Sequence, residues 1–512
     1  MSAHGNGRAP ASEGLDRALL GIATVVVLGT IMSILDTTIV NIAINHLSSD
    51  FDSPLPTIQW VATGYLLALA TVIPLTGWAA DRFGTKRLYM TSLALFLAGS
   101  ALSGMAWSAH SLIAFRVLQG LGGGMIMPAG MTILTQAAGP QRVGRVMSVI
   151  GAPMLLGPIL GPVLGGWLVD DVSWRWIFYV NVPIGAVALV LAQRILQPDQ
   201  PRPHHKLDVL GLLLLSPGLA ALVYGLAEAG SHGGFDGPRQ IVPTLAGIAL
   251  IAAFVWHALR AQAPLIDVRL FKRHTPAVSG LTMALFAAAF FGAMLLLPLY
   301  YQVARGESAL DAGLLLIPQG VGAAIMMPIA GRVVDRTGAA RVVWPGLVLT
   351  LLGFGFFTQV AADTSYALLM AASFVAGLGI GATMMPTMAA AYQTLTHAEV
   401  SRATTAFNIV QRGFGALGVA LMSVILANQL ADRLPGAASA GEGLQAAQSI
   451  PPAARERMAP LVADAFAHTY MWAFALIVLA AIPALFLPRT KPAAPQPAQE
   501  RADEAVAVAI EV

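Results

Sequence analysis

Two charged residues stand inside long apolar stretches of the sequence. Asp36 lies in Leu35-Asp-Thr-Thr-Ile-Val-Asn41, and Arg116 lies in a later stretch. A carboxylate deep in a bilayer costs about 2.5–3.5 kcal/mol on insertion scales, so it must face a partner or a cavity. Such a carboxylate can carry protons, because its surroundings control its pKa. We predict this role for Asp36; the alternative is a structural hydrogen bond to a neighbouring helix.

Arg116 is expected at nearly the same depth as Asp36. Counted from the outer ends of their helices, the two lie within roughly 6 Å in depth, at about 1.5 Å per residue. A long arginine side chain can span that gap if the two helices are neighbours. We predict that Arg116 pairs with Asp36 in one state and releases it in another. The alternative is that Arg116 snorkels to the outer interface.

A charged motif, G-x-x-x-D-R-x-G-x-x-R, occurs twice. It reads Gly77-Trp-Ala-Ala-Asp81-Arg82-Phe-Gly84-Thr-Lys-Arg87 and then Gly331-Arg-Val-Val-Asp335-Arg336-Thr-Gly338-Ala-Ala-Arg341. Simple anchoring by positive charge on the cytoplasmic side does not require a fixed spacing. We therefore predict a gate that latches two halves of the protein on that side. Its residues are Gly77, Asp81, Arg82, Gly84, Arg87, Asp335 and Arg336.

A glycine stripe marks the stretch at 143–169. Gly157, Gly161 and Gly165 recur every four residues, and Pro158 and Pro162 stand beside them. Small residues at this spacing let another helix approach closely, and each proline removes a backbone hydrogen bond. Two interpretations are equally supported by the residues alone: a rocking surface between two halves of the protein, or ordinary tight packing.

A second buried cation, Arg412, is expected near the middle of the bilayer. No acidic residue lies at mid-depth in the second half of the sequence. Arg412 is therefore expected to bind an anionic substrate group, to hydrate a cavity, or to bond helix carbonyl groups. Polar residues in the apolar stretches are candidates for lining the same cavity: Asn41, Gln119, Tyr392, Asn408 and Gln411.

The elements that must position these residues are membrane-spanning helices. Of 512 residues, 56% are hydrophobic and only 11% are charged, and the mean hydropathy is +0.71. Soluble domains carry roughly 25% charged residues. Apolar stretches of about 20 residues predict an all-α membrane protein, whereas barrel strands would be shorter and alternating. We find fourteen, at 18–44, 58–80, 88–107, 111–136, 143–169, 175–196, 208–228, 240–259, 276–303, 309–332, 342–361, 365–392, 403–430 and 468–488.

The repeats divide these helices into two bundles. The charged motif and a glycine run, Gly120–Gly124 and later Gly377–Gly381, recur at almost the same interval. Two parallel six-helix units with two helices between them explain both intervals. The predicted parts are a cytoplasmic N-terminus 1–17, a first bundle 18–196, two linker helices 208–259, a second bundle 276–488 with an outside loop 431–467, and a disordered cytoplasmic tail 490–512.

Charge sets the orientation. With both termini in the cytoplasm, most of the 29 basic residues fall inside, as the positive-inside rule requires. Those expected outside are Arg175, Arg239, Arg305, Arg433, Arg455 and Arg457. Removing both linker helices would preserve this pattern and leave twelve spans, but 208–228 and 240–259 are each long enough to cross. We expect a multi-pass protein of the cell membrane whose first apolar run is retained rather than cleaved.

Several functional classes are disfavoured. The chain has no cysteine, which excludes disulfides and thiolate metal sites. His204 and His205 lack a third ligand at a useful spacing, so no metal is expected. No phosphate-binding loop is present, so ATP is not the energy source. No nucleophile–base pair appears either. We expect neither an enzyme nor a cofactor, no nucleic-acid partner, and a functional monomer.

Together these motifs resemble the major facilitator superfamily, in particular its fourteen-helix drug:proton antiporter branch, over about residues 18–490. The segment 77–87 looks like the family's loop signature, which helps control gating. Arg116-Val-Leu-Gln119-Gly120 resembles a signature linked to proton coupling, and Gly157-Pro158-Ile-Leu-Gly161-Pro162 resembles the antiporter motif. Leu35-Asp36 through Ala43 matches the branch's first-helix signature, with Asn45 where proline is usual.

The resemblance implies a proton-coupled antiporter that exports drugs or other small amphipathic compounds. Its partners are then a small-molecule substrate, protons and the lipid bilayer. The alternative is a dedicated exporter of one endogenous metabolite, lipid or siderophore. A membrane receptor that transports nothing is disfavoured, because it has no need of paired gate motifs. The absence of a mid-depth carboxylate in the second half leaves the substrate's charge open.

Overall fold

The structure, a computed structural model, describes residues 17–139, 142–198, 206–396, 399–434, 447 and 452–489. All regular secondary structure in these ranges is helical, which confirms the predicted all-α class. The helices before the linker are α1 (Arg17–Asp50), α2 (Leu55–Val72), α3 (Leu75–Phe83), α4 (Thr85–Gly104), α5 (Ala109–Ala138), α6 (Val143–Asp171), α7 (Trp176–Tyr179) and α8 (Asn181–Ile195). The linker pair is α9 (Val209–His232) and α10 (Pro238–Arg260). The rest are α11 (His274–Leu299), α12 (Ala309–Thr337), α13 (Ala340–Phe357), α14 (Tyr366–Tyr392), α15 (Val400–Arg433) and α17 (Pro452–Ala484), with a 3-10 helix at Val268–Lys272 and a π-helical turn at Tyr300–Ala304.

Most of these helices are suited to a bilayer. Among the described residues, 11 helices are long and apolar enough to cross a membrane, or 12 if the bent pair α2–α3 is one span. Large apolar side chains such as Leu352, Trp472 and Phe486 are more than half exposed on the outside of the bundle. Such a surface would be unfavourable in water and is favourable against lipid chains. α4 and α6 also occupy predicted positions, at Thr85–Gly104 and Val143–Asp171.

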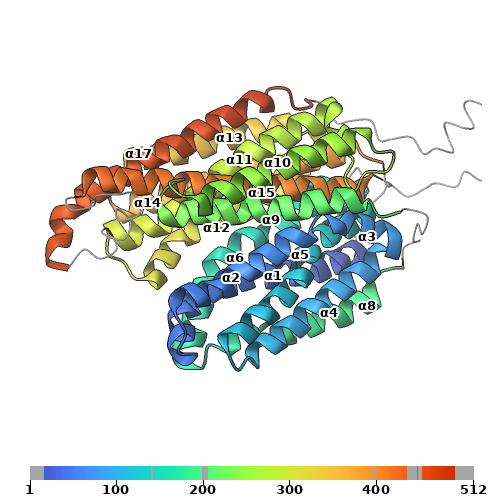
Figure 1. The fold of residues 1–512 in the computed structure, drawn as a ribbon. Coiled ribbons are helices and arrows are strands. Elements are labelled where there is room, and N and C mark those ends of the chain that lie inside the picture. Colours follow the sequence, from blue (N-terminus) through green and yellow to red (C-terminus); the bar gives the residue numbers. More distant parts are fainter. Residues whose placement is uncertain are drawn as a thin grey trace, which may run out of the picture.

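The helices gather into two groups with α9 at their boundary. The blue to teal helices α1 to α8 lie on one side of the bundle and the yellow to red helices on the other (Figure 1). α9 packs on both α2 and α15. Ser216 Oγ donates to the Thr71 carbonyl at 2.6 Å, and Ser423 Oγ donates to the Gly230 carbonyl at 2.6 Å. α9 therefore contacts one helix of each group.

The predicted helix 58–80 is bent. α2 and α3 meet at an angle of 56°, with the break at Ile73 and Pro74. Proline lacks the N–H that would continue the hydrogen-bond ladder, which explains a kink at this position. The bend lets α3, which carries the start of the first charged motif, pack against α15.

The last helix begins earlier than the predicted residue 468, within the predicted outside loop 431–467. α15 continues to Arg433 and α17 begins at Pro452. Proline is favoured in the first turn of a helix, where its missing N–H has no cost. The sequence does not reveal this first part of α17, because Arg455-Glu456-Arg457 interrupts the apolar pattern. Residues 1–16 and the predicted tail 490–512 lie outside the described residues.

Asp208 fastens the linker helices at the end where α9 begins. Its Oδ1 accepts from the Gly211 N–H at 2.8 Å and lies 2.9 Å from His257 Nε2 of α10, while its Oδ2 accepts from the Leu265 N–H at 3.0 Å. Burial alone would raise the pKa of Asp208, but these hydrogen bonds and the His257 ring hold the pKa below its ordinary value. The ionised carboxylate therefore stabilises the fold.

Asp208→Ala should destabilise the protein by about 1–2 kcal/mol, because it removes a helix cap and leaves two amide donors without an acceptor. The measurement is thermal unfolding of the purified protein in detergent. Because the folded pKa is lowered, the stabilisation is present above the unfolded pKa of about 3.9 and disappears as the pH falls through the folded value. The difference in stability between variant and wild type should therefore become smaller as the pH falls. Asp236→Ala, at an exposed position between α9 and α10, is the control and should unfold like wild type.

Candidate functional site

Three helices bring polar side chains together around Asp36. Arg116 Nη1 of α5 lies 2.6 Å from Asp36 Oδ2 of α1. Gln119 Nε2 donates to Asp36 Oδ1 at 2.9 Å, and Asn181 Nδ2 of α8 donates to the same oxygen at 3.2 Å. These four side chains are at most 1% exposed. The charged cluster, as we name Asp36, Arg116, Gln119 and Asn181, is therefore a buried ion pair with both carboxylate oxygens hydrogen-bonded.

Arg116 is held from several directions. Its Nη1 also donates to Gln119 Oε1 at 2.7 Å, and its Nε donates to the Val61 carbonyl at 3.3 Å. The guanidinium lies over the Tyr65 ring of α2, 4.1 Å from the ring centre. The structure thus brings the predicted pair together, and Arg116 points into the bundle rather than to the outer interface. A proton on Asp36 would leave the arginine charge buried without its counterion, so protonation and pairing compete.

Sequence reasoning missed Asn181 and Tyr65. Asn181 begins α8 directly after the short helix α7, and its Nδ2 also donates to Ser100 Oγ at 3.1 Å. An amide near the end of an apolar stretch carries no charge and gives little warning of its role. Tyr65 is an ordinary aromatic residue in an apolar helix until the structure places it under Arg116. The predicted Asn41 has a side chain that lies outside the described residues.

The glycine stripe on α6 packs against α1, in the same group of helices. A Cβ on Gly157 would overlap Ile34, and a Cβ on Gly161 would overlap Thr38, two residues from Asp36. Gly165 is buried, and the side chains of Pro158 and Pro162 lie outside the described residues. The close approach predicted from the spacing is present.

The surface of α6 that faces the second group of helices is a different one. A Cβ on Gly144 would lie 2.6 Å from the Gly331 carbonyl oxygen, and one on Gly151 would lie 2.8 Å from Met327 and Met385 atoms. A rocking surface between the groups would therefore involve these two glycines. The predicted stripe instead sets the distance between α6 and the helix that carries Asp36.

Gly161→Ala should impair function by pushing α1 away from α6 beside Asp36. Overpacking of this kind typically costs about 1–3 kcal/mol, and here the displaced residue neighbours the charged cluster. The measurement is the transport rate in proteoliposomes, with thermal unfolding in parallel. Gly166→Ala on the same helix is the matched control, because a Cβ there meets nothing within 4 Å. Equal transport by both variants would contradict the proposed tight contact.

The first charged motif joins its own group to α15. Arg402 Nε lies 3.1 Å from Asp81 Oδ2, and Ser401 Oγ donates to the Gly77 carbonyl at 3.2 Å. A Cβ on Gly77 would lie 3.1 Å from Thr405 Oγ1, so the small residue permits the close approach. Gly84 forms the turn after α3 with a φ of 89°. Of the predicted basic residues, Arg82 is half-buried and Arg87 is exposed.

The second copy joins α12 to the start of α6. Asp335 Oδ1 accepts from the Gly144 N–H at 2.8 Å and Oδ2 accepts from the Arg145 N–H at 3.2 Å. The Arg145 Nε lies 3.7 Å from the same carboxylate, which is almost fully buried. The first amides of a helix are unpaired and carry partial positive charge, so an aspartate is stabilised there.

Both copies of the motif therefore connect the two groups of helices. We call these contacts the two latches: Asp81 with Arg402, and Asp335 with the start of α6. The turn glycines match as well, since Gly338 has a φ of 94° beside the 89° of Gly84. The predicted Arg336 follows Asp335 at the end of α12.

The remaining predicted cavity residues lie on α14 and α15, apart from the charged cluster. Asn408 Nδ2 lies 3.6 Å from Met131 Sδ of α5, and Gln411 Nε2 lies 4.0 Å from Met384 Sδ of α14. Tyr392 is buried against Phe407, with ring centres 5.7 Å apart, and its hydroxyl has no partner among the described residues. Arg412 is partly buried on α15.

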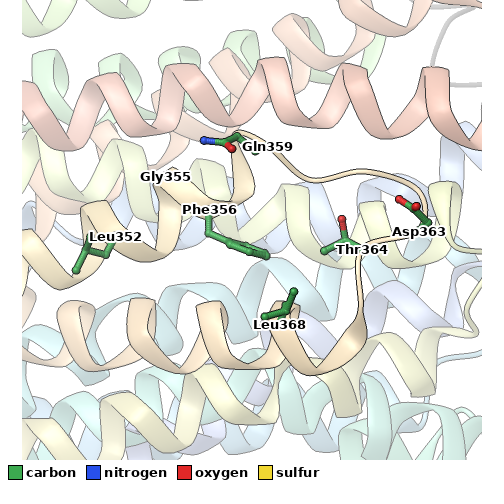
Figure 2. A pocket seen from close by; sticks show the side chains of 7 residues that line it. All are labelled: Leu352, Gly355, Phe356, Gln359, Asp363, Thr364 and Leu368. Carbon is green, nitrogen blue, oxygen red and sulfur yellow. The ribbon is translucent and has the colours of Figure 1, made fainter.

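A separate groove opens between α13 and α14 on the outside of the bundle (Figure 2). Its volume is about 590 Å³, and it is lined by Leu352, Gly355, Phe356, Gln359, Asp363, Thr364 and Leu368. Leu352 and Leu368 are more than half exposed, as lipid-facing residues are. The groove contains none of the residues predicted for proton coupling, gating or substrate binding.

Comparisons with known proteins agree with this architecture. The Major Facilitator Superfamily model matches residues 26–426. A Mycobacterium tuberculosis protein described as "Multidrug resistance protein B homolog" is 43% identical over 491 residues, covering 93% of this chain and 91% of that protein. The "Multidrug export protein EmrB" of Haemophilus influenzae is 30% identical over 80% of this chain and 81% of its own length.

Solved structures show the same fold at low sequence identity. The human organic anion transporter MFSD10 superimposes with a TM-score of 0.57 at 16% identity, covering 90% of this chain and 99% of that one. The proton:xylose symporter XylE gives a TM-score of 0.59 at 14% identity, covering 92% and 96%. With the family match over most of the chain, these likenesses lead to one conclusion: this chain belongs to the major facilitator superfamily, and it is a multi-pass membrane transporter rather than an enzyme.

Proposed function

We propose that this transporter is a proton-coupled antiporter that exports drugs or other small amphipathic compounds across the cytoplasmic membrane. The observation that carries the proposal is the buried pair of Asp36 and Arg116, 2.6 Å apart in the charged cluster. Intramembrane ionisable groups are retained for function far more often than for stability. The relatives named for multidrug resistance and export support the choice of substrate class.

The pair gives the proton a physical means of changing the protein's conformation. A proton that arrives from outside binds the Asp36 carboxylate and converts it to a neutral acid. Arg116 then loses its counterion, which destabilises the arrangement of α1, α5 and α8 around it. The conformation with the two latches closed becomes less favourable, and the groups rock until the proton can leave on the other side. Binding of substrate from inside follows deprotonation.

The energy of the proton is sufficient for export. One elementary charge that moves through 100 mV releases about 2.3 kcal/mol. Since a tenfold gradient corresponds to about 1.4 kcal/mol, one proton supports a concentration ratio of tens-fold. Catalytic groups are not needed, because transport requires only that two conformations bind the proton and the substrate differently.

The proposed topology has fourteen spans. α4 and α6 add two to the bilayer-crossing helices, because they are 20 and 29 residues long and pack along other helices of the bundle, α4 on α5 and α6 on α1 and α12. Both latches then lie on the cytoplasmic side, and both termini are cytoplasmic. We propose that the monomer is the functional unit, since the charged cluster and both latches form within one chain.

The test is reconstitution into liposomes with an imposed pH gradient. Uptake of a fluorescent amphipathic compound is followed in inside-out vesicles, with protein-free liposomes as the control. Uptake that depends on the gradient and collapses with a protonophore supports antiport. A wild-type protein that moves no amphipathic probe at any pH contradicts the proposal, and favours a dedicated exporter of one endogenous compound.

A further inference from the structure

Arg412 is a cation on α15 for which the described residues supply no partner. It makes no hydrogen bond or ion pair with them, and its Nε is sealed from solvent without an acceptor. Arg116, by contrast, is the one fully buried basic side chain among the described residues, and it has carboxylate and carbonyl partners. An unpaired charge inside a membrane protein is unfavourable, so its partner is expected to arrive from elsewhere.

The helical spacing shows which way Arg412 faces. Positions 401, 405, 408 and 412 share one face of α15, because they are three or four residues apart. That face contacts the first group of helices: Ser401 bonds the Gly77 carbonyl, and Asn408 lies against Met131. Arg412 therefore faces the boundary between the two groups, one turn beyond Asn408.

The opposite face of α15 is the lipid-facing one. Phe414, Leu417 and Leu421 are exposed on the outside of the bundle. They lie about 140–180° around the helix from Arg412, at roughly 100° per residue. The accessible surface of Arg412 is thus directed into the protein and not to lipid. Arg412 is also about 16 Å along the helix from Ser401 at the first latch, which is roughly half the thickness of a bilayer core.

The residues near Arg412 on this face of α15 are polar but include no carboxylate. Asn408 Nδ2 donates to the Thr404 carbonyl of the same helix at 2.9 Å and lies 3.6 Å from the thioether sulfur of Met131. Its Oδ1 has no partner among the described residues. The methionines Met131 and Met384 supply adaptable apolar surface beside these groups. Such a site suits an acidic group attached to an apolar body.

We propose that Arg412 binds the acidic group of the transported compound, and that the substrates include amphipathic organic acids, carboxylates first among them, in ionised form. The inference rests on the proposed function and narrows its substrate class. A fixed positive charge disfavours monovalent cations at the same place. An anion that leaves and a proton that enters both make the inside more positive. A membrane potential that is negative inside therefore drives both halves of the exchange.

Equilibrium binding tests the site without requiring transport. The probes are dansyl-phenylalanine, a carboxylate, and dansyl-phenylalaninamide, its neutral analogue, with the detergent-purified full chain near neutral pH. A charge-assisted hydrogen bond contributes about 1.5–3 kcal/mol, so wild type should prefer the acid by about tenfold to a hundredfold. Arg412→Gln should remove this preference while the amide binds as before. A wild type without preference, or a folded Arg412→Gln that keeps it, overturns the proposal.

Arg412→Lys decides the question if Arg412→Gln does not fold. Lysine keeps the charge but cannot form the two parallel hydrogen bonds of a guanidinium. The preference for the acid should then fall several-fold without disappearing. A preference equal to that of wild type overturns the proposal.

Transport by the same variants separates this proposal from the proposed function. If neither probe moves with the pH gradient in wild type, antiport of such compounds fails, while the binding preference still tests Arg412. If the neutral amide moves and the acid has no advantage, antiport stands and the Arg412 proposal fails. Asp36→Asn should stop the transport of both probes and leave the binding preference for the acid intact.

Discussion

Asp36→Asn is expected to reduce gradient-driven transport to the level of protein-free liposomes. Asparagine has nearly the same shape and its amide oxygen can still accept from Arg116, so the chain should still insert and fold. It cannot bind and release a proton near neutral pH, and no other carboxylate lies in the charged cluster among the described residues. The measurement is uptake of a fluorescent amphipathic compound in inside-out proteoliposomes with an imposed pH gradient.

A double variant separates lost coupling from lost stability. Asp36→Asn leaves the Arg116 charge buried without a counterion, and breaking a buried pair in this way costs about 3–5 kcal/mol. Asp36→Asn with Arg116→Gln removes both charges, so its thermal stability should recover toward that of wild type. Transport should remain absent in both. Recovery of transport in the double variant would show that the single variant failed through instability alone.

Asp50→Asn is the matched control on the same helix. Asp50 lies near the end of α1, where its carboxylate is about half exposed and lies 3.4 Å from Arg175. An exposed pair of this kind contributes little, so transport should equal that of wild type. If Asp36→Asn continued to concentrate the probe along the pH gradient, the proton would have to be carried elsewhere.

The sequence predicts the charged residues of the site better than their polar partners. Asp36 and Arg116 stand out because ionisable groups are rare in apolar helices, and depth counted along each helix already placed them close together. Asn181 and Tyr65 give no such signal, because a neutral amide or phenol is common in a transmembrane helix. Their roles depend on which helices are neighbours, which a single sequence does not specify.

The sequence predicts where helices pack closely, but it does not predict which helix is the partner. The spacing of Gly157 and Gly161 predicts a smooth face, and the structure shows that α1 is the helix lying on it. The repeated motif predicts that Asp81 and Asp335 act alike, but their partners differ. One pairs with the Arg402 side chain, and the other accepts backbone amides of α6. Backbone donors leave no trace in a sequence, so the partners of Asp335 could not be predicted from it.

Asp335→Asn is expected to open the protein on the side where both latches lie. The asparagine oxygen can still accept from the Gly144 N–H, but its amide group then faces the Arg145 N–H, donor against donor. Loss of one charge-assisted hydrogen bond at this buried position costs about 1.5–3 kcal/mol. The balance between closed and open conformations should shift by roughly tenfold to a hundredfold toward the open one. The opening should extend along the whole boundary between the two groups of helices, because packed groups of helices move as units.

The natural chain contains no cysteine, so a single introduced cysteine reports this opening. Thr405→Cys is suitable, because Thr405 is buried beside Gly77 at the first latch, away from the substituted Asp335. Its rate of labelling by a maleimide added to the cytoplasmic side should rise by the same factor in Asp335→Asn. Asp311→Asn, in the exposed first turn at the other end of α12, should leave the rate unchanged. Unchanged protection of Thr405→Cys in the Asp335 variant would mean that the second latch is only local packing. A faster rate would mean that one latch senses the other, as two halves rocking about the charged cluster require.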